Sequence, residues 1–203
     1  SIVVCDFNSK QENLDQKLRF LKDRFVDGLI LFPGSCASSE VLQEYMDAGI
    51  PIVIVNDDMP DINTDKVTID NSNASFRAVE YLIHQNHRDI AIINGDQNTY
   101  TGRERYKGYL EALQTYNIEP REEYITYGWF SNRGGYEAAK KLISLPKPPT
   151  AIYTTNYYMT FGAIIALNEA KIKVPDDISF IGFDHFELSD VINPPLTVVE
   201  QPT

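Results

Sequence analysis

Short runs of β-branched and other apolar residues alternate along this chain with amphipathic stretches of about 10 to 15 residues. This alternation is typical of repeated βαβ units, in which helices connect parallel strands. Most of the runs are continuously apolar, as expected for strands that are covered on both faces. The sequence therefore predicts the α/β class. The predicted strands are Ile2–Cys5, Gly28–Phe32, Ile52–Val55, Val67–Ile69, Ile90–Ile93, Ala151–Tyr153, Ile178–Phe183 and Leu196–Val199.

Between these runs, apolar residues recur at helical spacing and predict helices that each turn one face to a core. The aromatic residues on these faces are explained by the core and need no ligand. A polar turn, Gln85–Arg88, precedes the buried run Ile90–Ile93, so we expect a subdomain boundary there. The helical stripes are Leu14/Leu18/Leu21, Val41/Leu42/Tyr45, Phe76/Val79/Ile83, Tyr106/Tyr109/Leu110/Leu113 and Phe161/Ile164/Ile165.

The charge of the chain limits its partners. Its net charge is −11, from 18 Lys and Arg against 29 Asp and Glu, so most of its surface would repel a phosphate backbone. No apolar run approaches the roughly 20 residues that span a bilayer, and no membrane partner is expected. Cys5 and Cys36 lie beside apolar runs. That placement favours buried thiols and a reducing cytoplasm over a disulfide framework.

Polar residues follow the predicted strands. Ligands of open parallel sheets bind beyond the carboxyl ends of the strands, so these residues are candidates for a site. Carboxylate and amide oxygens accept hydrogen bonds from hydroxyl groups, and an arginine donates a fixed fork, which together suits a sugar. The alternative is that the Asp and Asn residues cap the helices that follow. The set is Asp6, Phe32-Pro33, Asn56-Asp57, Asp70-Asn71, Gly95-Asp96, Thr155-Asn156 and Asp184, with Arg103 and Arg105 nearby.

Five stretches of the chain, in the same order, resemble the signature sequences of the LacI/GalR family of bacterial transcription regulators. They are Leu82–Ile93, Arg105–Tyr109, Pro149–Ile152, Val174–Asp184 and Pro195–Pro202. Periplasmic sugar receptors share the fold and some of these features. The Pro-x-Leu-Thr and Gln-Pro ending favours a regulator over a receptor.

The resemblance implies a type I periplasmic-binding-protein-like fold, in which two doubly wound parallel-sheet subdomains flank a ligand cleft. Residues 1–87 would form most of the N-terminal subdomain, and residues 88–203 the C-terminal subdomain and the start of the crossing back. Compared with the family, the first strand and helix would precede Ser1, and the last helices and strand would follow Thr203.

The resemblance also implies which residues bind the effector. Asp70 matches the acidic residue after a short strand, and Arg105 matches the arginine of the Arg-x-x-Gly stretch. The other matching positions are Phe32, Phe130, Asn156, Asp184 and Gln201.

Two positions depart from the family pattern. Tyr157 stands where an Asp is frequent, and Trp129 stands where an acidic residue is common. The pocket would therefore be more aromatic than usual, and Trp129 or Phe130 could stack on the apolar face of a pyranose. The alternative is an aromatic residue at the rim that packs on its own subdomain.

From this resemblance we expect the effector-binding and dimerisation core of a LacI-type regulator. A small sugar or sugar derivative would close the cleft and modulate the binding of operator DNA by a helix-turn-helix headpiece outside this chain, in a homodimer. The alternative is an exported sugar-binding receptor of a transporter, which would use the same cleft.

Catalysis, metal sites and cofactors are not expected. The phosphate-loop, dinucleotide-binding and nucleophile-elbow motifs do not occur. His84 and His87 are three residues apart but have no third metal ligand nearby in the sequence, so polar surface is the better interpretation.

Overall fold

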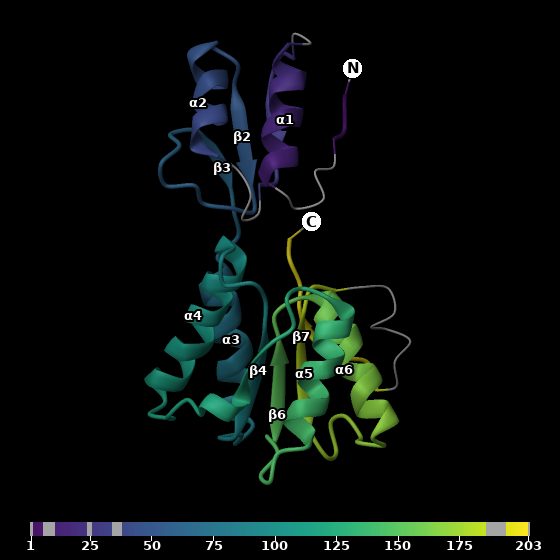
Figure 1. Cartoon of the computed structure of the whole chain (residues 1–203). Helices are drawn as coiled ribbons and strands as arrows, with labels where there is room; N and C mark the ends of the chain where they lie inside the picture. Colours follow the sequence, from purple (N-terminus) through teal and green to yellow (C-terminus); the bar gives the residue numbers. More distant parts are fainter. Residues whose placement is uncertain (1, 6–10, 24–25, 34–37, 186–193, 203) are drawn as a thin grey trace. The chain divides into compact units, whose positions relative to one another are not determined.

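The computed structural model describes residues 2–5, 11–23, 26–33, 38–185 and 194–202. Its contacts divide the chain into two compact units. Unit 1 is Ser1–Ile69 with Asn98–Tyr100, and unit 2 is Asp70–Gln97 with Thr101–Thr203. Both units are built from helices and parallel strands, so the predicted α/β class is confirmed (Figure 1).

Unit 1 contains a three-stranded parallel sheet in the order β1-β2-β3. Its elements are α1 (Gln11–Lys22), β1 (Leu29–Leu31), α2 (Ser39–Asp47), β2 (Ile52–Val55) and β3 (Asp65–Val67). The predicted stripes on α1 and α2 are buried together with the inner side of the sheet. Tyr45 is fully buried and its hydroxyl donates to the carbonyl of Leu18, which satisfies the one polar atom of its side chain.

The predicted strand Ile2–Cys5 is wrong. These residues have no regular structure and lie exposed, and none of them pairs with the described sheet of unit 1. A β-branched run becomes a strand only where a neighbouring strand takes up its backbone hydrogen bonds. Cys5 is exposed for the same reason, so the prediction of a buried thiol is wrong for Cys5, while Cys36 lies outside the described residues.

Unit 2 contains a five-stranded parallel sheet in the order β5-β4-β6-β7-β8. Helices α3 and α4 lie on one side of this sheet and α5 and α6 on the other (Figure 1). The strands are β4 (Ile90–Asn94), β5 (Ile125–Tyr127), β6 (Ala151–Thr154), β7 (Ser179–Phe183) and β8 (Thr197–Val199). The helices are α3 (Asn71–His84), α4 (Tyr100–Thr115), α5 (Asn132–Ile143) and α6 (Tyr157–Glu169), with a short 3₁₀ helix at Glu122–Tyr124.

Every residue of the central strands β4 and β6 is buried, as their continuous apolar runs predict. One stripe residue is placed differently from the prediction. Phe161 is exposed, whereas Met159, Ile164 and Leu167 of the same helix belong to the core.

Helix α3 belongs to unit 2. Its Ser75 hydroxyl lies 2.6 Å from the hydroxyl of Tyr153 on β6, and both side chains are buried. The contacts therefore divide the chain before α3, whereas the boundary expected from the sequence lies after this helix, at residue 87.

Within the described part of the chain, no helix is long and apolar enough to cross a membrane.

Candidate functional site

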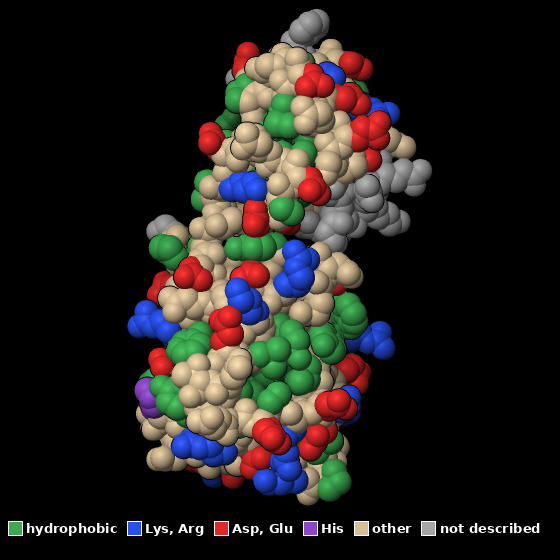
Figure 2. Space-filling model, turned by 90° about the vertical axis from the view of Figure 1, so that its left-hand side faces the viewer, with side chains coloured by type: hydrophobic (Ala, Val, Ile, Leu, Met, Phe, Trp, Pro, Cys, Tyr) green, Lys and Arg blue, Asp and Glu red, His purple; other side chains and the backbone are tan. Residues whose placement is uncertain are grey.

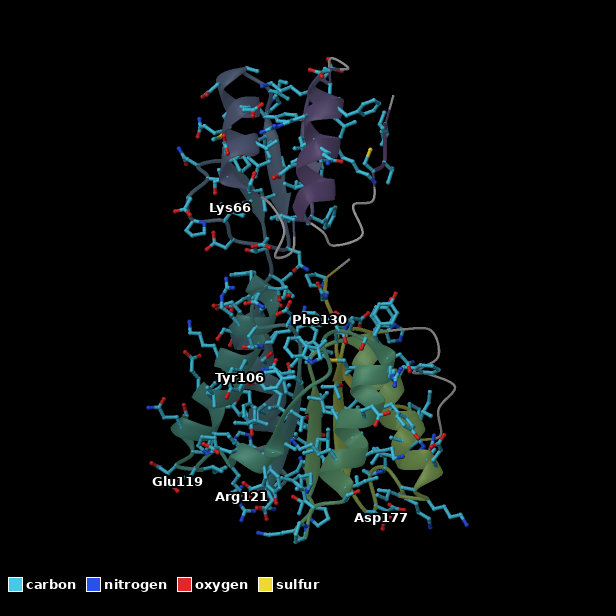
Figure 3. All side chains as sticks on the ribbon, viewed as in Figure 1. Lys66, Tyr106, Glu119, Arg121, Phe130 and Asp177 are labelled. Atoms are coloured by element: carbon cyan, nitrogen blue, oxygen red, sulfur yellow. The ribbon has the colours of Figure 1, made fainter. Side chains whose placement is uncertain are left out.

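The carboxyl ends of the strands of unit 2 bring several of the predicted residues together. Arg105 of α4, Asp184 after β7 and Gln201 after β8 form one connected group. Asn156 follows β6 and lies next to Thr155, whose carbonyl accepts from Arg105. Phe130 follows β5 and lies at the opposite end of the unit from Arg121 (Figure 3). Parallel strands end at one edge of a sheet, so residues distant in sequence meet there.

Arg105 is the centre of this group, and it is 3% exposed. Its Nε donates to Oδ1 of Asn71 over 2.8 Å, and its Nη1 donates to the Thr155 carbonyl over 2.5 Å. Asp184 Oδ2 lies 3.9 Å from Nη1. Among the residues that the structure describes, Nη2 has no hydrogen-bond partner, so two N–H donors of a fixed guanidinium remain for a ligand.

The surroundings of Arg105 fix its plane and moderate its charge. The guanidinium carbon lies 3.6 Å from the centre of the Phe183 ring, close enough for a cation–π interaction. Burial lowers the pKa of Arg105, and the negative charge of Asp184 opposes that shift. An arginine keeps its proton in proteins, so the site retains a positive charge with one carboxylate beside it.

Asp184 is held in place by backbone conformation and by Gln201. Its φ of 73° lies in the left-handed region, which Asp tolerates better than most residues. Its backbone N–H donates to the carbonyl of Val199 over 2.8 Å, and the Gln201 amide donates to its carboxylate. The pair Asp184 and Gln201 joins the last two strands of the sheet at the site.

Asn71 is a site residue that the sequence analysis named only as a neighbour of Asp70. It is 1% exposed and lies in the first turn of α3. The close approach of α3 and α4 brings it to Arg105. A Cβ on Gly108 would lie 2.0 Å from the Ser72 carbonyl, so only glycine allows this approach. The glycine of the Arg-x-x-Gly stretch is therefore a packing requirement that places the arginine.

Asp70 and Asn156 both cap the helices that follow them. The Asp70 carboxylate accepts from the Asn73 backbone N–H over 3.0 Å, and the Asn156 side chain accepts from that of Met159 over 2.9 Å. Asp70 is exposed and Asn156 is buried. A ligand contact by either residue stays a prediction, because an oxygen that caps a helix can accept a further hydrogen bond.

Phe130 and Trp129 occupy a turn of unusual conformation after β5. Both have positive φ, 53° and 54°, which costs energy for side chains of this size. The Phe130 ring packs on Gly95, where a Cβ would lie 2.0 Å from the ring, and against the core of its own unit. Trp129 is 61% exposed and its ring centre lies 5.9 Å from that of Tyr127.

Tyr157 and Tyr158 add further aromatic surface at the start of α6, with ring centres 4.0 Å apart. A hydrogen bond with Tyr158 and burial raise the pKa of Tyr157 to about 12, so the hydroxyl stays neutral and can donate. Hydrophobic side chains also gather on the face of unit 2 that Figure 2 shows. At the strand ends themselves, the aromatic side chains are Trp129, Phe130, Tyr157 and Tyr158.

Of the seven effector-binding residues that the family resemblance implies, Phe32 is the one that belongs to unit 1. It directly follows β1 and is 61% exposed. Its part in ligand binding stays a prediction. Asp6, which the sequence analysis placed at the end of the first strand, lies outside the described residues.

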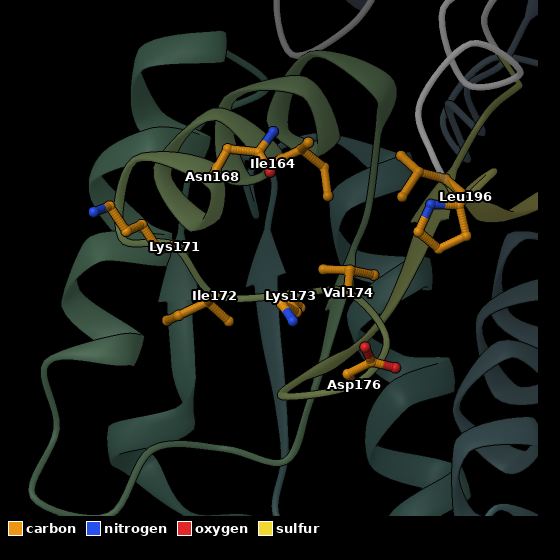
Figure 4. A pocket seen from close by; sticks show the side chains of 9 residues that line it. Ile164, Asn168, Lys171, Ile172, Lys173, Val174, Asp176 and Leu196 are labelled. Carbon is orange, nitrogen blue, oxygen red and sulfur yellow. The ribbon is translucent and has the colours of Figure 1, made fainter.

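A hollow of about 500 Å³ lies elsewhere in unit 2, near the amino ends of β7 and β8 (Figure 4). None of the predicted ligand residues lines it. Its walls are Ile164, Asn168, Lys171, Ile172, Lys173, Val174, Asp176, Pro194 and Leu196.

The two histidines near the end of α3 have separate partners. His87 bridges the Thr150 and Ser179 hydroxyls, each at 2.9 Å, whereas Nε2 of His84 lies 3.0 Å from the hydroxyl of Tyr116. Among the described residues, no three or more His, Cys, Asp or Glu side chains lie close enough together to hold a metal ion.

Comparison with known proteins places these features in a family. Residues 79–203 match the periplasmic binding protein-like domain. The chain is 36% identical over 176 residues to the Bacillus subtilis protein named probable HTH-type transcriptional repressor ExuR, covering 87% of the chain and 53% of that protein. It is 34% identical over 206 residues to the HTH-type transcriptional repressor PurR of Histophilus somni, covering 99% of the chain and 60% of that protein. The chain thus spans little more than half the length of these curated relatives.

Solved structures agree with this assignment. A sugar-binding transcriptional regulator of the LacI family from Escherichia coli, complexed with phosphate, is 29% identical with a TM-score of 0.87, covering 98% of this chain and 72% of that one. The E. coli transcriptional repressor ascG is also 29% identical, with a TM-score of 0.83 and coverage of 98% and 73%. The chain belongs to the LacI/GalR family of transcription regulators and carries their periplasmic-binding-protein-like, effector-binding domain.

Proposed function

We propose that this domain binds a small sugar or sugar derivative at the Arg105 edge of unit 2 and that the ligand regulates DNA binding by the whole protein. The observation that carries the proposal is the state of Arg105. A buried guanidinium is fixed through Nε and Nη1, while Nη2 has no partner among the described residues. The fixed guanidinium can donate to one ligand oxygen through Nη2. The Asp184 carboxylate beside it can accept from a neighbouring hydroxyl of the ligand.

The proposal of a regulator rests on the relatives, which are named as transcriptional repressors. DNA binding would come from a helix-turn-helix segment of the parent protein, because the net charge of −11 makes this chain a poor DNA ligand by itself. A homodimer in the cytoplasm, acting on a two-fold operator, is the arrangement we propose. The names of the relatives do not favour the alternative of a transport receptor.

We also propose that the ligand leaves unchanged. The groups around Arg105 are a carboxylate, amides, a carbonyl and aromatic rings, and they bind and orient a ligand without offering an activated nucleophile.

The regulator proposal is tested with the full-length protein. Its operator would first be selected from random DNA fragments, and its affinity then measured with and without neutral sugars, sugar acids and sugar phosphates. At least one of these compounds should change operator affinity, because linkage requires ligand and DNA to change each other's affinity by the same factor. The Arg105→Ala variant should retain operator binding and lose that response. If the full-length protein selects no DNA, the regulator proposal is contradicted and the alternative of a transport receptor is favoured.

A further inference from the structure

Asn94, the last residue of β4, holds an amide group that the fold does not satisfy. Its side chain is 0% exposed. Its Oδ1 accepts from the backbone N–H of Gly95 over 3.1 Å. Its Nδ2 atom is buried and has no hydrogen-bond partner among the residues that the structure describes.

The strand register places this amide on the same side of the sheet as Arg105. Side chains alternate along a strand, and Ala91 and Ile93 belong to the core that α5 and α6 cover. Asn94 therefore turns to the other side, where α3 and α4 pack. Arg105 comes from α4 and bonds to Asn71 of α3 on that side.

Asn94 also lies at the carboxyl ends of the strands, the edge of the sheet where the candidate site is found. The backbone N–H of Thr155 donates to the Ile93 carbonyl over 3.2 Å, so β4 and β6 stay paired up to the residue before Asn94. The carbonyl of the same Thr155 accepts from Arg105 Nη1. Thr155 therefore hydrogen-bonds both to the backbone next to Asn94 and to the guanidinium of Arg105.

A buried donor without an acceptor destabilises a fold, whereas an apolar side chain of similar shape at the same place does not. Groups of this kind tend to occur where function requires them. Asn94 Nδ2 is buried without a partner, and Arg105 Nη2 has no hydrogen bond to a described residue; both donors lie at one edge and on one side of the sheet. What they lack is an acceptor from outside the fold.

We propose that Asn94 is a specificity-determining residue of the effector site, whose Nδ2 donates to a ligand oxygen that only accepts, as in a carboxylate or carbonyl group. This inference rests on the proposed function of the Arg105 edge. A hydroxyl oxygen suits the donors less well, because its own proton must also find an acceptor. Nδ2 is buried, so a ligand reaches it only after a local adjustment of the residues around it. Tyr127, which pairs with Asn94 in the register and is 40% exposed, is placed to make that adjustment.

The first test compares pairs of probes that differ at one carbon: glucuronate with glucose, and galacturonate with galactose. Calorimetry would be done on the whole 203-residue chain as wild type, Asn94→Leu and Arg105→Leu. Wild type should prefer the acid of a pair, and Asn94→Leu should lower that preference about tenfold while leaving the neutral sugar unaffected. An undiminished preference in Asn94→Leu would overturn the role of Asn94. If Arg105→Leu binds both the acid and the neutral sugar of a pair as tightly as wild type does, the proposed function is overturned instead.

A second measurement needs no ligand. In the ligand-free protein, the side-chain amide protons of Asn94 should resonate upfield, as those of an amide without an acceptor do. Matched spectra of Asn94→Leu assign the signals. A downfield proton in the ligand-free protein would place the acceptor inside the fold and overturn the proposal, whichever sugar binds.

Discussion

Asn71 Oδ1 and Arg105 Nε are joined by a buried hydrogen bond of 2.8 Å that ties the first turn of α3 to α4. The two residues are 34 positions apart, and neither belongs to a strand. With the Thr155 carbonyl on the other side, this bond fixes the guanidinium before any ligand arrives. Prior fixing of a binding group lowers the entropic cost of binding.

Replacing Asn71 with leucine should destabilise the protein by about 1–3 kcal/mol, because Nε of a buried guanidinium would lose its acceptor. Urea unfolding measures the change. Asn73→Leu is the matched control, since Asn73 lies two residues along the same helix with its side chain exposed. Equal stability of the two variants would contradict the importance of the Asn71 bond.

Gly108→Ala should cost about 1–3 kcal/mol, because its Cβ would overlap the Ser72 carbonyl and push α3 away from α4. Gly28→Ala serves as the control, since its nearest neighbours would lie at ordinary contact distance, 3.4 Å or more. The variant should also weaken ligand binding, as Arg105 would lose its contact with Asn71. A Gly108→Ala protein as stable as Gly28→Ala would show that the helices can separate freely.

His87 should make stability depend on pH. Burial lowers the pKa of its imidazole from the ordinary 6.5, so the folded protein binds this proton less readily than the unfolded chain. The stability contribution is therefore present above pH 6.5 and is lost as pH falls from there to the folded-state pKa. Unfolding free energies at pH 7.5 and 5.5, roughly one unit either side of that value, measure the loss. His87→Gln should flatten this part of the profile, and an unchanged slope would assign the effect to other groups.

The regular elements with strong apolar patterns could be predicted from the sequence. Ile90–Ile93 and Ala151–Tyr153 are continuous runs and form the buried centre of the larger sheet. Strand β5 was not predicted because its one buried residue, Thr126, is polar. Helix α5 was not predicted because three of its four buried residues, Gly135, Ala138 and Ala139, are small, and Leu142 is the one large apolar residue among them.

The site could be predicted only in part. Arg105, Asp184 and Gln201 follow from the resemblance, and the structure brings them together. The roles of Asn71 and Asn94 could not be predicted. The partner of Asn71, Arg105, is distant in the sequence, and Asn94 is recognised only because its Nδ2 has no hydrogen-bond partner among the described residues. Such features depend on helix packing and strand register, which local patterns do not specify.

The most direct test of the Arg105 site is calorimetric titration of wild type, Arg105→Ala and Arg103→Ala with neutral sugars, sugar acids and sugar phosphates. Arg103 is an exposed arginine on the same helix and controls for the loss of one positive charge. For the compound that binds wild type most tightly, Arg105→Ala should lose about 1.5–3 kcal/mol of binding free energy, or roughly 10- to 150-fold in affinity, while Arg103→Ala should stay close to wild type. Equal affinity of Arg105→Ala and wild type for that compound would contradict the site described here.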